Sequence, residues 1–231
     1  MIKHFTVKND NNNNSFKGIK IEKQNFNYYF KKWRQLLDKG STLSILFAGV
    51  GGQGIILATK VLAEAALKKG LDIKVSEVHG MAQRGGSVLG SVRIGREVFS
   101  PTINKADFII ALEKLEALRY IDKLDCSGFI IINDFKIYPI SVFSGSENYP
   151  EDIISKVEDK TPNYILVKAV EIAKRLGEIR TSNIILIGCL SNFIPIEEKF
   201  WIQSIKESVP AKAINVNIEA FKEGRQIVNK Y

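Results

Sequence analysis

The sequence predicts an α/β fold in which a largely parallel sheet is covered by helices on both faces. Two observations predict it. Short, mainly apolar runs, such as residues 43–48 and 106–112, alternate along the chain with longer amphipathic segments such as residues 55–69. Turn-forming residues bound these runs, as expected for strands that are buried on both faces. With 231 residues, of which 45% are hydrophobic, the chain is long enough to bury one sizeable core.

Six segments are expected to be strands because they are short, apolar and bounded by turn signals. They span residues 43–48, 71–78, 87–94, 106–112, 129–133 and 164–167. No internal repeat of fixed period accompanies them. The sheet is therefore expected to be a single, mostly parallel, Rossmann-like layer between two layers of helices.

Helices are expected where apolar residues recur at three- and four-residue steps. They span residues 55–69, 115–121, 169–176, 184–193, 197–208 and 218–228, and a further helix opens at residues 150–152. Gly70 and Gly177 follow two of these helices, where a left-handed residue is typical. Asn183 is expected to cap the helix at 184–193, for which a strand is the alternative.

Residues 1–40 differ in composition from the rest of the chain. They hold nine of the 33 Lys and Arg residues and three of the 25 Asp and Glu residues, so they carry +6 of the net charge of +8. Residues 9–14 form an Asn-rich patch that is expected to be disordered. The sequence thus divides into a basic, partly disordered N-terminal extension at 1–40 and a main domain at 41–231.

A basic amphipathic helix is expected near the end of this extension. Its apolar residues share one helical face: Phe26, Tyr29, Phe30, Trp33, Leu36 and Leu37. This face is expected to pack on the domain itself or on a partner, and attachment to a membrane surface or to nucleic acid is the alternative. Removal of residues 1–38 is expected to leave the main domain folded.

Composition excludes several classes of protein. The main domain is nearly neutral, at +2, which speaks against a nucleic-acid-binding face. No apolar run approaches the roughly 20 residues of a membrane span, and no secretory signal is visible. Cys126 and Cys189 are too few for a disulfide framework or an iron–sulfur ligand set. The cytoplasm is the expected compartment.

A glycine-rich loop follows the first expected strand and opens the first helix of the main domain. Gly49, Gly51 and Gly54 fit the pattern G-x-G-x-x-G, with Gly52 and Gln53 between them. Such a loop lets a phosphate group approach the backbone at a helix N-terminus. Glu77 follows about 20 residues on, where a dinucleotide-binding fold holds its ribose. The alternatives are that the glycines only allow a helix and a strand to pack closely, or that the loop faces another subunit.

A second loop, at residues 77–88, combines an acid, an imidazole, an amide and a guanidinium with glycines. It is expected beside the first loop, at the carboxyl edge of the sheet. His79 and Arg84 are the candidate catalytic residues. His79 has the chemistry for proton transfer, and Arg84 for holding a phosphate or carboxylate. A structural hydrogen bond of His79, or an ion pair of Arg84 with Glu77 or with another subunit, is the alternative. The remaining candidate binding residues of this loop are Gln83, Gly85 and Gly86.

The two loops together resemble those of the gamma-type subunits of 2-oxoacid:ferredoxin oxidoreductases, and most of all the branch that acts on indolepyruvate. The motifs that carry the resemblance are G-V-G-G-Q-G at 49–54, V-H-G-M-A-Q-R-G-G-S-V at 78–88, F-S-P at 99–101, L-E-A-L-R-Y at 115–120 and Y-P-E-D at 149–152. Asn183 with Gly188, and V-P at 209–210, fit as well. The resemblance covers about residues 43–228, and Lys168 departs from it because an acid is expected there.

The resemblance implies a fold like that of domain III of pyruvate-ferredoxin oxidoreductase and a role as the non-cluster subunit of a complex. A large partner subunit would carry thiamine diphosphate and [4Fe–4S] clusters. The complex would convert an aryl pyruvate and coenzyme A to acyl-CoA, carbon dioxide and reduced ferredoxin. The alternatives are a gamma subunit that acts on pyruvate or 2-oxoglutarate, and a stand-alone NAD(P)-binding protein. Neither a nucleic-acid partner nor a membrane span is expected.

Overall fold

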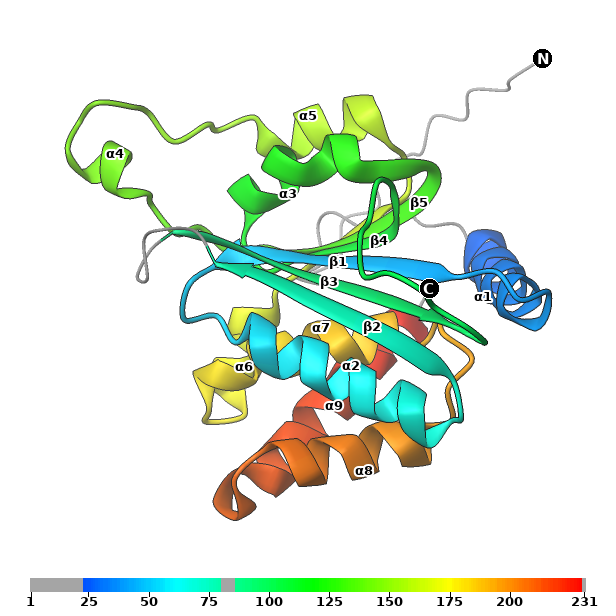
Figure 1. The fold of residues 1–231 in the computed structure, drawn as a ribbon. Coiled ribbons are helices and arrows are strands. Elements are labelled where there is room, and N and C mark those ends of the chain that lie inside the picture. Colours follow the sequence, from blue (N-terminus) through cyan, green and yellow to red (C-terminus); the bar gives the residue numbers. More distant parts are fainter. Residues whose placement is uncertain (1–22, 80–85, 230–231) are drawn as a thin grey trace.

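The computed structural model describes residues 23–79 and 86–229, which form an α/β fold around one six-stranded sheet (Figure 1). The strand order is β2-β3-β1-β4-β5-β6. The strands are β1 (Leu43–Val50), β2 (Asp72–His79), β3 (Ser87–Gly95), β4 (Ala106–Ala111), β5 (Leu124–Asn133) and β6 (Tyr164–Val167). All six expected strands are thus present.

Helices cover both faces of the sheet, which confirms the expected three layers (Figure 1). The helices are α1 (Lys23–Asp38), α2 (Ile55–Lys68), α3 (Lys114–Tyr120), α4 (Ile140–Phe143), α5 (Ile153–Lys160), α6 (Ala169–Arg175), α7 (Ser182–Leu190), α8 (Glu198–Ser208) and α9 (Ile214–Asn229). Helices α3 and α5 lie on one face, and α2, α6 and α7 lie on the other, with α8 and α9 outside them. Short 3₁₀ turns occupy Ile121–Lys123, Ile179–Thr181 and Ala211–Ala213.

The sheet is mixed but mostly parallel. Strands β1, β4, β5 and β6 pair in parallel, with Ala48 opposite Ala111 where β1 meets β4. Strand β3 runs antiparallel to both β1 and β2 and lies between them. The sequence offers the reason, because only seven residues separate β2 from β3, whereas two adjacent parallel strands need a crossover of about a dozen residues or more.

The core consists of two clusters, one on each face of the sheet. Alternate residues of β1 face opposite ways: Phe47 packs in the cluster around α2 and α7, and Leu46 packs in the cluster with α3 and α5. Every residue of α7 after Ser182 is buried, so this helix is enclosed between the sheet and α9. The uniformly apolar segment that left helix and strand as alternatives is therefore a buried helix.

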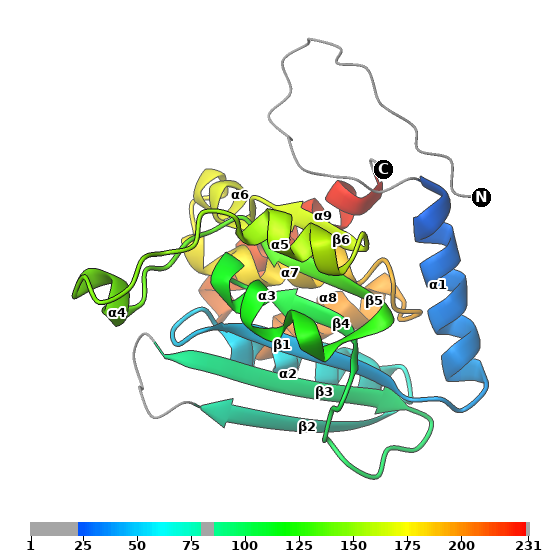
Figure 2. The same ribbon diagram turned by 90° about the horizontal axis from the view of Figure 1, so that it is seen from above.

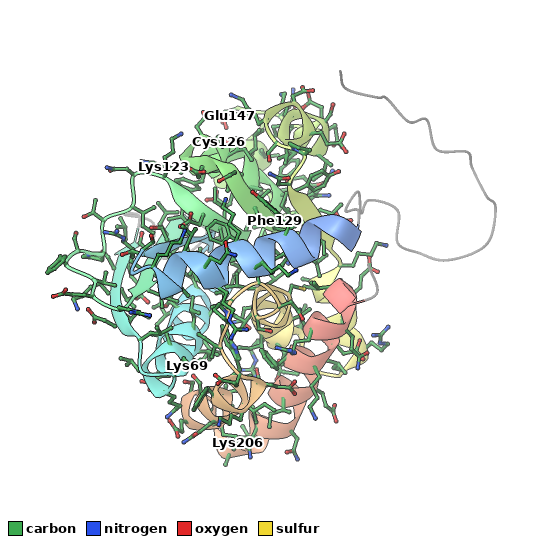
Figure 3. All side chains as sticks on the ribbon, turned by 90° about the vertical axis from the view of Figure 1, so that its right-hand side faces the viewer. Lys69, Lys123, Cys126, Phe129, Glu147 and Lys206 are labelled. Atoms are coloured by element: carbon green, nitrogen blue, oxygen red, sulfur yellow. The ribbon has the colours of Figure 1, made fainter. Side chains whose placement is uncertain are left out.

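Helix α1 packs on the protein's own core at the amino-terminal edge of the parallel strands (Figure 3). Trp33 is fully buried, and its ring centroid lies 5.0 Å from that of Phe108. Leu37 is buried in the same cluster, and Lys32 Nζ donates a 2.6 Å hydrogen bond to Ser127 Oγ. Trp33 and Leu37, on the apolar face of this basic helix, thus belong to the core of the domain at residues 41–231.

Two element boundaries differ from the expected ones by four or more residues. Strand β5 begins at Leu124 instead of Phe129, because its polar first half still pairs with β4 across an irregularity in register. Helix α9 begins at Ile214, four residues before the expected start at Ile218. The short helix α4 was not expected, since its few residues show no helical periodicity.

Candidate functional site

The carboxyl ends of the parallel strands carry both glycine loops, and the structure brings these loops into contact. Val50, the last residue of β1, pairs with Ser87, the first residue of β3. The amide of Gly51 donates a 3.0 Å hydrogen bond to the carbonyl of Gly86. The sequence-based expectation that the loops lie side by side is confirmed at these residues.

The first glycine loop is held by the side chain of Gln53. Its Oε1 accepts from the Val50 amide at 2.7 Å, and its Nε2 donates to the Leu112 carbonyl at 2.8 Å. Gly52 and Gly54 have φ of 97° and 77°, which a residue with a Cβ rarely adopts. Gln53 therefore fastens the end of β1 to the end of β4, with one hydrogen bond at each polar atom of its amide group.

Asn183 fixes the last residue of this loop, which corrects the expectation that it caps a helix. Helix α7 begins at Ser182 after Thr181, so Asn183 lies inside the helix. Its Nδ2 donates to the Gly54 carbonyl at 2.9 Å. A Cβ on Gly54 would collide with this amide, so the glycine is required by the approach of α7. No local sequence pattern could reveal a contact between residues so far apart in the chain.

Glu77 lies on β2 and contacts helix α2. Its Oε1 accepts a 2.8 Å hydrogen bond from Thr59 Oγ1. Because β3 separates β2 from β1, Glu77 is one strand further from the glycine loop than an acid on an adjacent second strand would be. The structure thus engages Glu77 with α2 and places it away from the loop that it was expected to assist.

The second loop lies largely outside the described residues. His79 ends β2 opposite Val88, and nothing of its side chain is described. Gln83, Arg84 and Gly85 also lie outside the described residues. Ser87, directly after the loop, is tied to α3, because its hydroxyl donates to Glu116 Oε2 at 2.5 Å and lies 3.0 Å from Tyr120 Oη.

The contact of Ser87 explains part of the motif at residues 115–120. Glu116 is buried, and this burial raises the pKa of its carboxyl above the usual range, while the bonds to Ser87 and Arg119 oppose the rise. Arg119 Nε lies 3.1 Å from Glu116 Oε1. The side chains of this motif therefore attach Ser87, at the end of the second loop, to helix α3.

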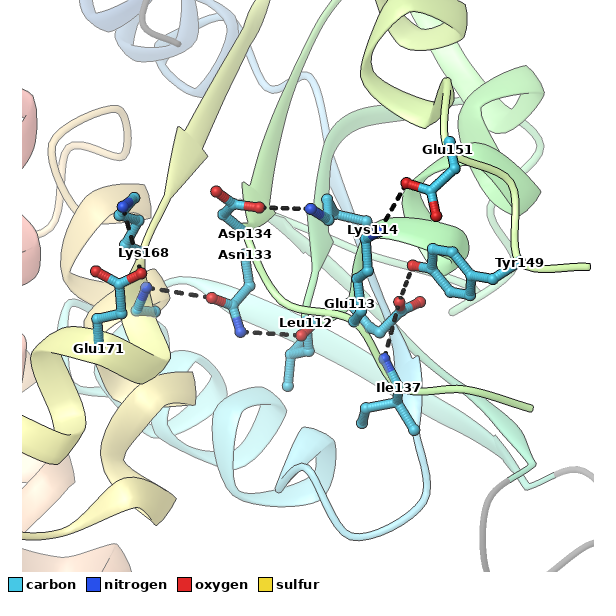
Figure 4. Close-up of polar contacts among 12 residues, drawn as sticks. Leu112, Glu113, Lys114, Asn133, Asp134, Ile137, Tyr149, Glu151, Lys168 and Glu171 are labelled. Carbon is cyan, nitrogen blue, oxygen red and sulfur yellow. Dashed lines mark hydrogen bonds and ion pairs between the residues drawn. The ribbon is translucent and has the colours of Figure 1, made fainter. Parts of the chain in front are cut away.

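A second polar cluster, which sequence reasoning missed, lies where β4 ends (Figure 4). Glu113 is 1% exposed and accepts hydrogen bonds from Tyr149 Oη at 2.5 Å and from the amides of Ile137 and Glu116 at 3.2 Å each. Burial and the neighbouring carboxylate raise the pKa of Tyr149 far above its usual range, so the phenol remains a donor. Glu113 thereby holds the segment before α5 against the sheet.

Amide groups continue this network across the strand ends (Figure 4). Asn133 Nδ2 donates to the same Leu112 carbonyl that Gln53 contacts, at 3.0 Å. Asn133 Oδ1 accepts from the Ala169 amide at 3.2 Å. The ends of β1, β4, β5 and β6 are therefore joined by one chain of side-chain hydrogen bonds.

Three lysines follow the ends of the three parallel strands β4, β5 and β6, and each faces a carboxylate. The pairs are Lys114 with Asp134 at 2.6 Å, Lys136 with Glu151 at 3.0 Å and Lys168 with Glu171 at 3.3 Å. Each lysine has a carboxylate partner within 3.3 Å, so these three pairs add no net positive charge to the edge. Lys168, which stands where an acid was expected, is one of these lysines.

The part of the chain that the structure describes offers no ligand set for a metal ion, and the sequence has too few cysteines for an iron–sulfur cluster. Over residues 23–79 and 86–229, no group of three or more His, Cys, Asp and Glu side chains is placed to hold a metal ion. The two cysteines of the sequence lie apart, Cys126 exposed on β5 and Cys189 buried in α7. A [4Fe–4S] cluster needs about four thiolates, so this chain does not fit one. Among the described helices, none combines the length and apolar character of a membrane span.

Comparison with known proteins assigns the family. The family model described as pyruvate ferredoxin/flavodoxin oxidoreductase matches residues 44–227. The indolepyruvate oxidoreductase subunit IorB of Archaeoglobus fulgidus is 40% identical over 79% of this chain and 93% of its own length. The 2-oxoglutarate synthase subunit KorC of Methanothermobacter marburgensis is 30% identical over 80% of this chain and 95% of its own length.

A solved structure agrees with the fold. The gamma subunit of a keto/oxoacid ferredoxin oxidoreductase from Geobacter sulfurreducens superimposes with a TM-score of 0.61 and 22% identity, over 82% of this chain and 99% of that subunit. These findings define the class of the protein as an α/β subunit of an oxidoreductase. The chain belongs to the pyruvate ferredoxin/flavodoxin oxidoreductase family, in which it is a gamma-type subunit.

Proposed function

We propose that this chain is the non-cluster subunit of a complex that oxidatively decarboxylates indolepyruvate or a similar aryl pyruvate. The products are the aryl-acetyl-CoA, carbon dioxide and reduced ferredoxin. The observation that carries the proposal is the 40% identity to an indolepyruvate oxidoreductase subunit over 93% of that relative's length. Both glycine loops, on which the resemblance was first based, fall within the matched residues 44–227.

We assign decarboxylation and electron transfer to a large partner subunit. Thiamine diphosphate and [4Fe–4S] clusters on that subunit supply decarboxylation and electron transfer, in keeping with the two cysteines of this chain, which are too few to hold a cluster. This chain contributes its carboxyl edge. Its Gln53 and Asn183 hold the glycine loop in place by side-chain hydrogen bonds, so that the loop can face coenzyme A or the partner.

A reconstitution assay tests this proposal. This chain, the large subunit and the two mixed together are supplied with a 2-oxoacid and coenzyme A, and reduction of ferredoxin or a viologen is followed. We expect activity only in the mixture, only with coenzyme A, and with indolepyruvate or phenylpyruvate as the best substrates. Activity of this chain alone, or no gain on mixing, would contradict the proposal.

The 30% identity to a 2-oxoglutarate synthase subunit favours 2-oxoglutarate as the second candidate substrate. The same assay with pyruvate and 2-oxoglutarate decides between the substrates, because their small or acidic side groups need a different pocket from an aromatic ring. An absorbance spectrum of this chain alone decides the remaining alternative. Stoichiometric nicotinamide or flavin would indicate a stand-alone dinucleotide-binding protein.

A further inference from the structure

Residues 136–149, between β5 and α5, form an arm that projects from the body of the molecule (Figures 1 and 2). The arm carries α4 at its tip and leaves the sheet from the carboxyl end of β5. Both views show α4 standing away from the rest of the protein on the side of the loop that joins β1 to α2. The arm therefore extends from the edge that holds the glycine loops.

The base of the arm is fixed to the domain. Lys136 and Glu151 form a 3.0 Å ion pair across it, and Lys136 Nζ lies 5.1 Å from the centre of the Tyr149 ring. Tyr149 is buried and bonds to the buried Glu113. A charge-assisted bond of this kind makes a firm attachment.

The tip of the arm is an ordered turn with its own hydrogen bonds. The amides of Val142 and Phe143 donate to the Pro139 carbonyl at 3.0 and 3.2 Å. The amides of Ser146 and Glu147 donate to the Ser141 carbonyl at 3.0 and 3.2 Å. The turn is therefore ordered before any partner binds, which reduces the loss of conformational entropy on binding.

The surface of this tip is aromatic and nearly uncharged. Phe143 is 78% exposed, and Tyr138 is 45% exposed. Their rings meet edge to face at 6.1 Å, and Tyr138 meets Tyr149 in the same way at 5.2 Å, so the exposed rings rest on the buried one. Glu147 is the one charged residue in the sequence from 137 to 149. Exposed aromatic anchors on a rigid support are typical of the centre of a protein interface.

We propose that this arm docks into an apolar pocket of the large, cofactor-bearing subunit, with Phe143 as its anchor. This inference rests on the proposed function, because it takes the partner from it. The exposed aromatic side chains of the tip would be complemented by an apolar pocket of the partner. The single negative charge of Glu147 would be complemented by a basic group at the rim of that pocket. Under the proposed function the partner brings its cofactors to the glycine-loop edge, and the arm extends from that edge.

The test measures the affinity of the full chain for the large subunit by titration, with wild type and Phe143→Ala compared. We expect the dissociation constant to rise at least about 10-fold in Phe143→Ala, while its melting temperature stays unchanged because the side chain is exposed. Leu67→Ala is the matched control. Leu67 is also an exposed apolar residue, at 51%, but it lies in the last turn of α2, away from the glycine loop. Its removal should leave the affinity unchanged.

The outcomes separate the two proposals. If wild type binds the large subunit and Phe143→Ala binds equally well, the arm is not the docking element. If Phe143→Ala instead converts a dimer of this chain to a monomer in sedimentation, the arm binds a second copy and the inference is wrong. If wild type itself does not bind the large subunit, the proposed function fails, and the inference fails with it.

Discussion

Asp107, near the start of β4, is an ionisable side chain that folding places in an unfavourable environment. Its Oδ2 accepts a 2.8 Å hydrogen bond from the Ser44 amide. Burial nevertheless raises the pKa of Asp107 to about 6, from its ordinary value of 3.8. Because the folded-state pKa is the higher one, the folded chain binds the proton more tightly. This contribution to stability is present at low pH and is lost as the pH rises from about 4 through 6.

We therefore predict that Asp107→Asn stabilises the protein above pH 7, by on the order of 2 kcal/mol, and changes little near pH 4. Asparagine keeps an oxygen that can accept from the Ser44 amide without the cost of a buried charge. Melting curves at several pH values check this, with Asp159→Asn, an exposed position on α5, as control. A stabilisation that does not depend on pH would contradict this explanation.

Gly188 on α7 and Gly224 on α9 determine how closely these two helices approach each other. A Cβ atom added to either glycine would lie only 3.0 Å from the Cα atom of the other. Such a Cβ on Gly188 would also collide with the Phe221 carbonyl, and one on Gly224 with the Ile185 carbonyl. The enclosure of α7 by α9 thus depends on two residues without side chains.

Gly188→Ala is expected to lower the free energy of unfolding by about 3 kcal/mol, because backbone atoms must move apart in a packed core. Chemical denaturation measures the loss. Lys222→Ala is the control, since it introduces alanine at an exposed position of α9. Equal stability of Gly188→Ala and wild type would show that the two helices can separate without cost.

Trp33 makes α1 part of the core, so the extension and the domain are not independent in folding. We predict that Trp33→Ala lowers the free energy of unfolding by about 3–5 kcal/mol. Deletion of residues 1–38 is expected to lower the melting temperature as well, which revises the expectation from sequence. Thermal melts compare these variants with Arg34→Ala, whose side chain is exposed on the same helix. A wild-type melting temperature for Trp33→Ala would restore the view that the extension is dispensable.

Local patterns predicted most elements because each strand and helix is specified by residues close together in the chain. Six strands, and helices such as α2 and α8, follow from apolar periodicity and from glycines such as Gly70, whose φ is 83°. Periodicity could not reveal that Asn183 faces Gly54 or that Trp33 faces Phe108, because these are tertiary contacts. The roles of Gln53 and Glu77 likewise depended on which strands became neighbours.

At the scale of the whole molecule, the glycine-loop edge is the expected face toward the partner. Arg84, in the second loop, lies outside the described residues. Our hypothesis from sequence is that its guanidinium meets a carboxylate of the large subunit, and a phosphate of coenzyme A is the alternative. An arginine without its anion in a closed interface would be costly.

Arg84→Ala is predicted to weaken assembly, so that an excess of this chain restores most of the rate. If the arginine binds coenzyme A instead, the complex should assemble normally but show a raised apparent KM for coenzyme A. Titrations of this chain and of coenzyme A in the reconstituted assay distinguish the two. No change in assembly, coenzyme A dependence or rate would leave the second loop with an architectural role.

The hydrogen bond from Asn183 to Gly54 spans 129 positions in the chain, and this has a consequence for biosynthesis. A ribosome releases the glycine loop long before α7 has been made, because chains emerge from the N-terminus first. During that interval, Gly54 lacks the amide that later fixes its carbonyl. A nascent chain that ends before residue 183 lacks this amide, so its glycine loop stays unfinished until α7 has been translated.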